Sequence, residues 1–305
     1  MKLGLGLPTS GAGTNAAAIA RAAEEAERVG LDSIWTFERL MSPVDGAIGI
    51  GSTEPTLLPQ SYRSVYDPLE TLAYVAARTS TITLGTSVLD LLLHSPIVLA
   101  RRLATLDQLC GGRLLAGVGV GWMVAEFEAA GVPTERRGAR MEEHISAVRA
   151  VWGPDPVTHD GAFYKIASSW VGPKPAAPCG VRLLAGAMAP AAIERAGRMG
   201  VGLNLIMMSW EMLEGAVATF RTAAAKAGHD PSALPVVVRV NGGLSASPVD
   251  GRAPLTGSTE QVLEDLGRLS GTGGDHVFWD SAEDADDADD ADEQLGLLAQ
   301  LRRSI

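Results

Sequence analysis

The sequence predicts an α/β chain folded as one (β/α)8 TIM barrel over residues 1–305, on three observations. Short apolar segments alternate with longer amphipathic ones along the whole chain, as in parallel sheets covered by helices. Eight apolar segments occur, each followed by a helix or by a loop and a helix, and about 38 residues per unit suit a barrel with insertions. No break in composition divides the chain midway, which disfavours the main alternative, an open doubly wound sheet.

The expected strands are short and apolar, with many β-branched or small residues, as buried parallel strands are. A small hairpin is also expected at residues 157–166, turning at Asp160-Gly161. The eight strands of the barrel are placed at residues 2–7, 33–36, 81–88, 113–118, 181–185, 202–207, 234–240 and 276–279.

The expected helices have recognisable ends. Asp67 can cap free N–H groups and Pro68 suits a first helical turn, so a helix starts there. Gly30 and Gly200 each follow a helix, where a residue in the left-handed conformation closes the last turn. The remaining helices are placed at residues 15–29, 95–110, 138–152, 190–199, 209–227, 258–269 and 292–303.

Three long segments, at about residues 41–66, 153–180 and 241–257, are predicted to be loop insertions. Such loops form lids over barrel sites, so we expect them to determine the substrate. The run at 283–293 (EDADDADDADE) holds eight acidic residues and no basic one. It is interpreted as a solvated acidic loop, with an interaction tail or a calcium site as alternatives.

Charge and composition disfavour several classes of protein. The net charge is −11, and the acidic run accounts for −8 of it, so the rest of the chain offers no basic face for nucleic acid. No apolar run approaches the about 20 residues of a membrane span, and no signal-peptide pattern is recognised. Cys110 and Cys179 are the two cysteines, too few for a disulfide framework. A cytoplasmic protein with a small-molecule substrate and no nucleic-acid or membrane partner is expected.

The active site of such a barrel lies at the carboxyl ends of its strands. Glu38 and Arg39 follow the second strand and Asp90 ends the third, so these three are candidate catalytic residues. Trp35, Trp122 and Leu89 are candidate walls of the pocket, with plain core packing as the alternative for the two tryptophans. His94 is the one histidine near a strand end, which makes a metal centre a poor interpretation and no metal ligand is predicted.

Two segments rich in small residues lie at strand ends. Residues 117–122 (GVGVGW) lack the spacing of a dinucleotide fingerprint, so Gly119 and its neighbours either pack closely at the mouth of the barrel or face a cofactor. Residues 185–188 lead from the fifth strand toward a helix at 190, whose first N–H groups would suit a phosphate. A structural turn is the alternative for that second segment.

Four segments carry a resemblance to a known family: residues 66–73 (YDPLETLA), 81–88 (TITLGTSV), 104–113 (ATLDQLCGGR) and 117–122 with Glu126-Phe127. Together they resemble the bacterial luciferase-like monooxygenase superfamily, and within it the branch of oxidoreductases that use the deazaflavin coenzyme F420. The likeness extends from Leu3 to Phe278. It implies a (β/α)8 barrel, commonly a homodimer, with an isoalloxazine-type ring in the mouth of the barrel.

The resemblance also implies site residues. A bulge with a non-prolyl cis peptide backs the ring at the end of the third strand, by position Ser87-Val88, and Gly119 and Trp122 would lie near the ring. The family's phosphate-binding turn maps onto Ala185, Gly186, Ala187 and Met188. Family members often carry Asp-His at the end of the second strand, where this chain has Glu38-Arg39. The proton donor is therefore left open between Glu38 and Asp90, and Arg39 could hold an anionic group.

The predicted function is hydride transfer between coenzyme F420 and a small organic substrate. One alternative keeps the barrel and binds FMN in a luciferase-like monooxygenase that uses O2. Another is a non-catalytic flavin-binding barrel. For Glu38, the structural alternative to catalysis is an ion pair with Arg39 or Arg239.

Overall fold

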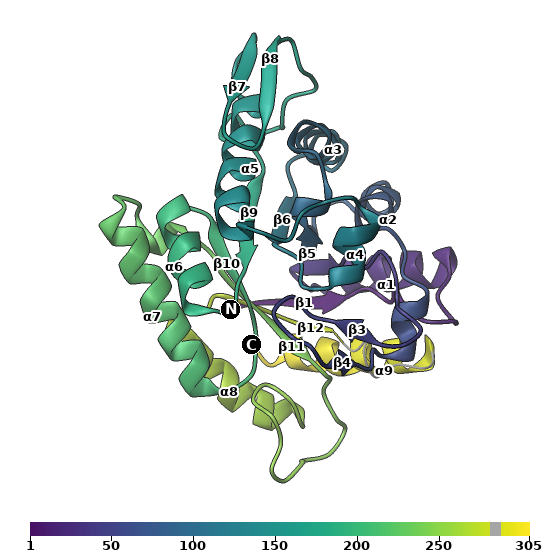
Figure 1. The fold of residues 1–305 in the computed structure, drawn as a ribbon. Helices are drawn as coiled ribbons and strands as arrows, with labels where there is room; N and C mark the ends of the chain where they lie inside the picture. The colour runs from purple at the N-terminus through teal and green to yellow at the C-terminus, as the bar shows by residue number, and fades with distance from the viewer. Residues whose placement is uncertain (281–287) are drawn as a thin grey trace.

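Eight parallel strands close into a barrel in the computed structural model, which describes residues 1–280 and 288–305. Around the barrel, neighbouring strands follow the order β1-β12-β11-β10-β9-β6-β5-β2, and the fold class predicted from the sequence is confirmed (Figure 1). The strands are β1 (Lys2–Gly6), β2 (Ser33–Thr36), β5 (Thr83–Asp90), β6 (Leu114–Gly119), β9 (Arg182–Gly186), β10 (Gly202–Ile206), β11 (Val236–Asn241) and β12 (His276–Asp280).

Helices surround the barrel, and their ends follow the predicted capping chemistry (Figure 1). The Asp67 carboxylate accepts the N–H of Leu69 at 3.0 Å at the start of α2, and Gly200 ends α6 with φ +60°. The helices are α1 (Ala16–Arg28), α2 (Pro68–Ala76), α3 (Pro96–Leu109), α4 (Val124–Ala129), α5 (Arg137–Trp152), α6 (Pro190–Met199), α7 (Trp210–Lys226), α8 (Thr259–Thr272) and α9 (Ala288–Arg303). None of the helices in the described part of the chain is long and apolar enough to cross a membrane.

The insertions have some structure of their own. Residues 41–66 contain a short antiparallel pair, β3 (Ala47–Ile48) with β4 (Pro55–Thr56), and the 3-10 turn η1 (Gln60–Arg63). The predicted hairpin forms from β7 (Val157–Asp160) and β8 (Lys165–Ser169), and projects beyond α5 in Figure 1. Its second strand runs past the predicted end at 166 because the turn takes residues 161–164 rather than two residues.

Differences from the predicted elements lie at the boundaries. The helix α9 begins at Ala288, before the predicted start at 292, so the acidic run is not a loop over its whole length. Residues 283–287 of that run lie outside the described residues, and the interpretation of that part stays a prediction. The six-residue helix α4 was not predicted; it lies in the segment between β6 and α5.

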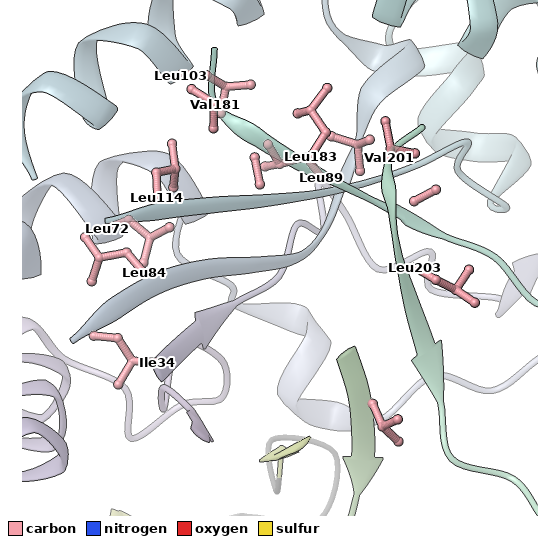
Figure 2. Packing of buried hydrophobic residues seen from close by; sticks show 14 of the residues in the cluster. Ile34, Leu72, Leu84, Leu89, Leu103, Leu114, Val181, Leu183, Val201 and Leu203 are labelled. Carbon is pink, nitrogen blue, oxygen red and sulfur yellow. The ribbon is translucent and has the colours of Figure 1, made fainter. Parts of the chain in front are cut away.

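The core has two layers. The larger apolar cluster packs the outer faces of the strands against the helices, as Leu84 of β5 and Leu72 of α2 do in Figure 2. A smaller cluster, formed by Trp35, Leu115, Leu184, Val237 and Phe278 from strands around the barrel, packs inside it. The rings of Trp35 and Phe278 stack with centroids 4.5 Å apart. Trp35 is therefore a core residue rather than a pocket wall, and so is Leu89, which is fully buried in the larger cluster.

Candidate active site

A cavity of about 530 Å³ opens at the carboxyl ends of the barrel strands. It is lined by ten of the eleven predicted site residues, namely Glu38, Arg39, Ser87, Val88, Asp90, Gly119, Trp122, Gly186, Ala187 and Met188. Its further lining includes Phe37, Leu57, Leu58, Tyr62, Asn204, Ile206, Arg239 and Asn241. Ala185 does not line the cavity, because it lies inside β9, pairs with Val118 and Leu203, and has its side chain in the core.

The back wall of the cavity is an irregularity of β5. Its pairing with β6 shifts between Thr86 and Leu89, and the Ser87–Val88 peptide bond is cis, as the resemblance implied. The Val88 side chain lies against two glycines: a Cβ at Gly119 or at Gly186 would approach its methyl groups to 2.8 or 2.9 Å. Glycine at these two positions therefore makes room for Val88 against the neighbouring strands β6 and β9.

Polar contacts from across the barrel hold this bulge. The Ser87 hydroxyl donates to the side-chain oxygen of Asn204 on β10 at 3.0 Å. The Ser87 carbonyl accepts a hydrogen bond from Arg239 on β11 at 3.0 Å, and Arg239 lies 3.1 Å from the Asp280 carboxylate. The Asn204 amide nitrogen is buried without a hydrogen-bond partner among the described residues, so it is a donor available to a ligand.

The turn after β9 presents backbone toward the cavity. The Ala187 N–H donates to the Asn204 carbonyl at 3.3 Å, so this amide is already engaged. At the start of α6, Pro190 is in the first turn and Ala189, at the cap position, makes no side-chain hydrogen bond to the helix. The helix N-terminus beside Met188 therefore keeps the partial positive charge that favours an anionic group.

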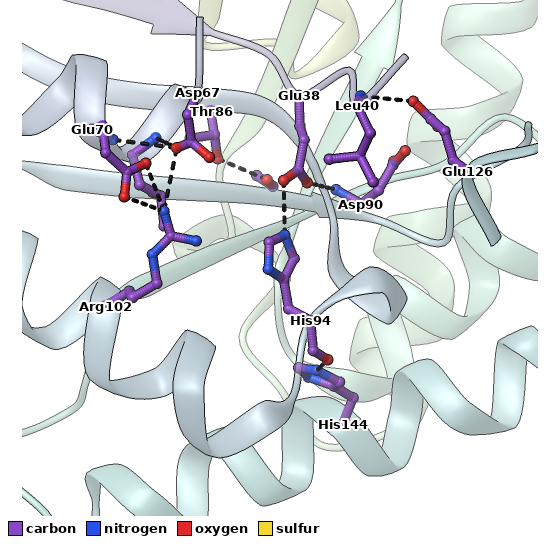
Figure 3. A network of polar contacts seen from close by, with 12 residues as sticks. Glu38, Leu40, Asp67, Glu70, Thr86, Asp90, His94, Arg102, Glu126 and His144 are labelled. Carbon is purple, nitrogen blue, oxygen red and sulfur yellow. Dashed lines mark hydrogen bonds and ion pairs between the residues drawn. The ribbon is translucent and has the colours of Figure 1, made fainter. Parts of the chain in front are cut away.

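Glu38 is paired with His94, which corrects the structural alternative of an ion pair with Arg39 or Arg239. One Glu38 oxygen lies 2.8 Å from Nε2 of His94, and the other accepts the backbone N–H of Asp90 at 2.7 Å (Figure 3). The short turn η2 (Leu91–Leu93) follows β5 and brings His94 back toward Glu38.

Arg39 is bound to Glu126 instead. Its Nη1 lies 2.7 Å from one carboxylate oxygen, and the other accepts the N–H of Leu40 at 2.8 Å. The guanidinium also lies over the rings of Trp122 and Tyr62, 5.3 and 5.7 Å from their centroids. Glu126 stood in the segment that carries the family resemblance, but nothing in the sequence linked it to Arg39.

Asp90 is buried at the end of β5, and its Oδ2 has no hydrogen-bond partner within residues 1–280 and 288–305. Burial raises the pKa of this carboxyl to about 7; the charges of Glu126 and Glu38 add to the rise, and those of Arg39 and His94 oppose it. Near neutral pH the group therefore exchanges a proton readily, as acid–base catalysis requires.

The lining of the cavity combines apolar and polar groups. No cluster of three or more His, Cys, Asp or Glu that could hold a metal ion occurs within residues 1–280 and 288–305. The walls combine apolar surface from Val88, Trp122 and Ile206 with a few buried polar atoms, which is typical of sites for large organic ligands. Asn204, whose buried amide nitrogen has no partner among the described residues, is one of these polar groups.

The sequence matches the model of the family described as Luciferase-like monooxygenase over residues 1–248. The chain belongs to this family. Among its curated relatives, the luciferase-like chain is 33% identical over 186 residues to an F420-dependent glucose-6-phosphate dehydrogenase of Kineococcus radiotolerans, a match that covers 59% of this chain and 49% of that protein. The chain spans about half to three-fifths of the length of the curated relatives it matches.

Two solved structures that share the fold align over nearly the whole chain. The monooxygenase RslO1 from Streptomyces bottropensis aligns over 100% of both chains with a TM-score of 0.81 and 22% identity. The coenzyme F420-dependent tetrahydromethanopterin reductase from Methanopyrus kandleri aligns over 98% of this chain and 97% of its own, with a TM-score of 0.76 and 18% identity. The resemblance to the luciferase-like family stated from the sequence is confirmed.

Proposed function

We propose that this protein is an F420-dependent oxidoreductase that transfers a hydride between the deazaflavin and a small organic substrate. The observation that carries the proposal is the back wall of the cavity, where Val88 at the β5 bulge rests on Gly119 and Gly186 and faces a space lined by apolar side chains. The relative from Kineococcus radiotolerans supports the choice of cofactor.

The residues present fit the cofactor by chemical type. Val88 and Trp122 would contact the faces of the ring, and the Asn204 amide would donate to an acceptor on its edge. The N-terminus of α6, beside Gly186 and Met188, would hold the phosphate. When bound, the deazaflavin supplies a carrier of two electrons as hydride.

The chain's own residues supply positioning and proton transfer. The segment with Leu57 and Leu58 lines the cavity and would exclude water from the acceptor. Glu38 and Asp90 are the carboxyl groups at the site. Arg39, whose charge is already paired with Glu126, contributes less free positive charge than the sequence suggested.

Direct titration tests the cofactor. Purified protein is mixed without oxygen with coenzyme F420 or with FMN, and quenching of tryptophan fluorescence is followed, since Trp122 lines the cavity. We expect F420 to bind at least about tenfold more tightly than FMN, a difference of about 1.4 kcal/mol. Tight FMN binding with none for F420 would overturn the proposal.

A matched pair of variants locates the binding site. Gly186→Ala places a Cβ 2.9 Å from Val88 and should weaken cofactor binding, whereas Gly215→Ala in α7 meets no atom within 4 Å and should leave it unchanged. Equal effects of the two variants would place the cofactor elsewhere.

The second candidate is a monooxygenase that binds FMN in the same cavity and uses O2, and the full-length structural match to the monooxygenase RslO1 favours it. Oxygen consumption by the protein with reduced FMN distinguishes it from the first. The homodimer and the cytoplasmic location expected from the sequence stay parts of this proposal, and light scattering tests the first of them.

A further inference from the structure

Glu38 and Asp90 differ in what their oxygens already contact. Both oxygens of the Glu38 carboxylate are held, one by His94 at 2.8 Å and one by the Asp90 N–H at 2.7 Å. Glu38 is 4% exposed, so water does not replace these partners. The hydrogen bonds of this carboxylate thus connect the end of β2 to the end of β5 and to the residue after η2, so both oxygens serve the fold.

Asp90 has the complementary arrangement. Its backbone is fixed by Glu38 and its side chain lines the cavity, but its buried Oδ2 makes no hydrogen bond within the described parts of the chain. Arg39, whose charge lowers the pKa of Asp90 more than that of His94 does, has its Nη1 on Glu126. A buried carboxylate without a bonded cation is disfavoured against its protonated form, which keeps an O–H to donate into the cavity.

Four charged groups act on the pKa of Asp90. Glu38 and Arg39 follow β2, Glu126 lies on α4 and His94 follows η2. Two of these are acidic and two basic, so their effects oppose one another, and burial is the largest cause of the raised pKa.

His94 is itself fixed from behind. Nε2 of the fully buried His144 on α5 donates to the His94 carbonyl at 3.0 Å (Figure 3). Burial lowers the pKa of His144 to about 4, so its ring is neutral near pH 7. A continuous series of contacts therefore runs from α5 through His94 and Glu38 to the backbone of Asp90.

We propose that Asp90 is the residue that transfers the proton in this cavity and that Glu38 and His94 are positioning residues that hold it there. This inference rests on the proposed function. As an acceptor carbon gains the hydride carried by the reduced deazaflavin, the electron pair of its double bond moves to the attached heteroatom. The Asp90 O–H bond breaks, the heteroatom takes the proton, and the carboxylate left behind regains a proton from solvent. In the oxidative direction each of these transfers is reversed.

Crossed variants separate the two carboxyl groups. Asp90→Asn keeps the shape but removes the transferable proton, and should lower kcat by about 10²- to 10⁴-fold, the usual size of a general-acid effect. Glu38→Gln also removes an ionisable proton but keeps an acceptor for the Asp90 N–H, and should lower kcat much less. Asp107→Asn, at a buried aspartate that accepts the N–H of Ala176 on the outside of the barrel, is the matched control and should leave kcat unchanged.

A loss in Glu38→Gln as large as that in Asp90→Asn, or no loss in either, would overturn the inference. The role of His94 is tested by His94→Leu and His94→Gln. Leucine should change the pH profile of kcat and leave KM for the cofactor in place, and glutamine, which can still donate to Glu38, should restore the profile. A pH profile unaffected by leucine would remove His94 from the mechanism.

A readout without cofactor separates this inference from the proposed function. In protein labelled with ¹³C at aspartate side-chain carboxyls and assigned through backbone connectivities, the Asp90 signal should titrate near neutral pH. Glu38→Gln should lower this midpoint, because the Glu38 charge raises the pKa of Asp90. A midpoint below about 5, the ordinary range for aspartate, would overturn the inference. Failure of the wild type to bind F420 would contradict the proposed function, whereas this titration would still determine the protonation state of Asp90.

Discussion

Two buried histidines are predicted to make the fold sensitive to acid. His276 on β12 is 3% exposed; it lies 2.6 Å from the Ser33 hydroxyl, and its ring meets Trp35 edge-on. Burial is the main cause that lowers its pKa to about 3, with the positive charges of Lys2 and Arg182 adding to it. For His144 burial lowers the pKa to about 4. Both rings must therefore stay neutral in the folded barrel and gain protons on unfolding.

The direction and size of the change in the free energy of unfolding with pH follow from the linkage between protonation and folding. Because each folded pKa lies below the ordinary value of 6.5, the stability that each histidine contributes is present above pH 6.5 and is lost as pH falls toward 4 or 3. At pH 5, which is 1.5 units below 6.5, the loss is about 2 kcal/mol for each histidine at about 1.4 kcal/mol per unit. Asp90 acts in the opposite direction, since its raised pKa makes the fold lose stability as pH rises through 7.

A difference between variants isolates one histidine from these opposing effects. The free energy of unfolding is measured in guanidinium chloride at pH 8 and pH 5 for the wild type and for His276→Gln. Between these pH values the wild type should lose about 2 kcal/mol more than the variant. His229→Gln, at a histidine outside the core, should lose as much as the wild type. Equal losses in wild type and His276→Gln, or a wild-type His276 ring signal that titrates near pH 6.5 by NMR, would refute the reasoning.

Two further predictions concern packing and charge around the site. Arg39→Ala should destabilise the fold by about 3–5 kcal/mol, because it leaves the buried Glu126 without its cation. As a control, Arg268→Ala, at an exposed ion pair, should change stability by less than about 1 kcal/mol. Similar shifts in Tm for the two variants would contradict this prediction. Gly85→Ala should cost about 1–3 kcal/mol in denaturant unfolding, because the added methyl would lie 2.3 Å from the Trp35 ring, and an unchanged midpoint would show that the ring moves freely.

The elements of the barrel could be predicted because their signals are local. The apolar runs, the cap at Asp67 and the glycines at 30 and 200 each act within a few residues of chain, and the structure places each where the sequence indicated. The errors are also local in origin. The helix α4 has six residues, too few for a periodic pattern to develop. For Trp35 the sequence left a pocket wall and core packing open, and the alternation of side chains along β2 turns it into the barrel interior.

The pairing of charges at the site could not be predicted in the same way. Glu38 and Arg39 are neighbours in sequence, yet their partners are distant. The partner of Glu38, just after η2, lies 56 residues away, and the partner of Arg39, on α4, lies 87 residues away. Opposite charges in sequence give many possible pairs, and the choice among them depends on how β5 ends and where η2 turns. A histidine three or four residues beyond a strand end was a weak signal for His94, because the same spacing fits an exposed loop.

The hydrogen bonds that their oxygens already make, rather than residue type, distinguish the two carboxyl groups as candidates for acid–base chemistry. Glu38 and Asp90 have the same functional group, similar burial and the same cavity, and position in the sequence cannot rank them. What separates them is that the backbone N–H of Asp90 and the His94 ring occupy both oxygens of Glu38, whereas Asp90 has a buried oxygen with no donor, which favours its protonated form. The same reasoning extends to any paired acids at a barrel mouth: the group whose oxygens are already bonded supports the structure, and the group left unbonded is available to the substrate.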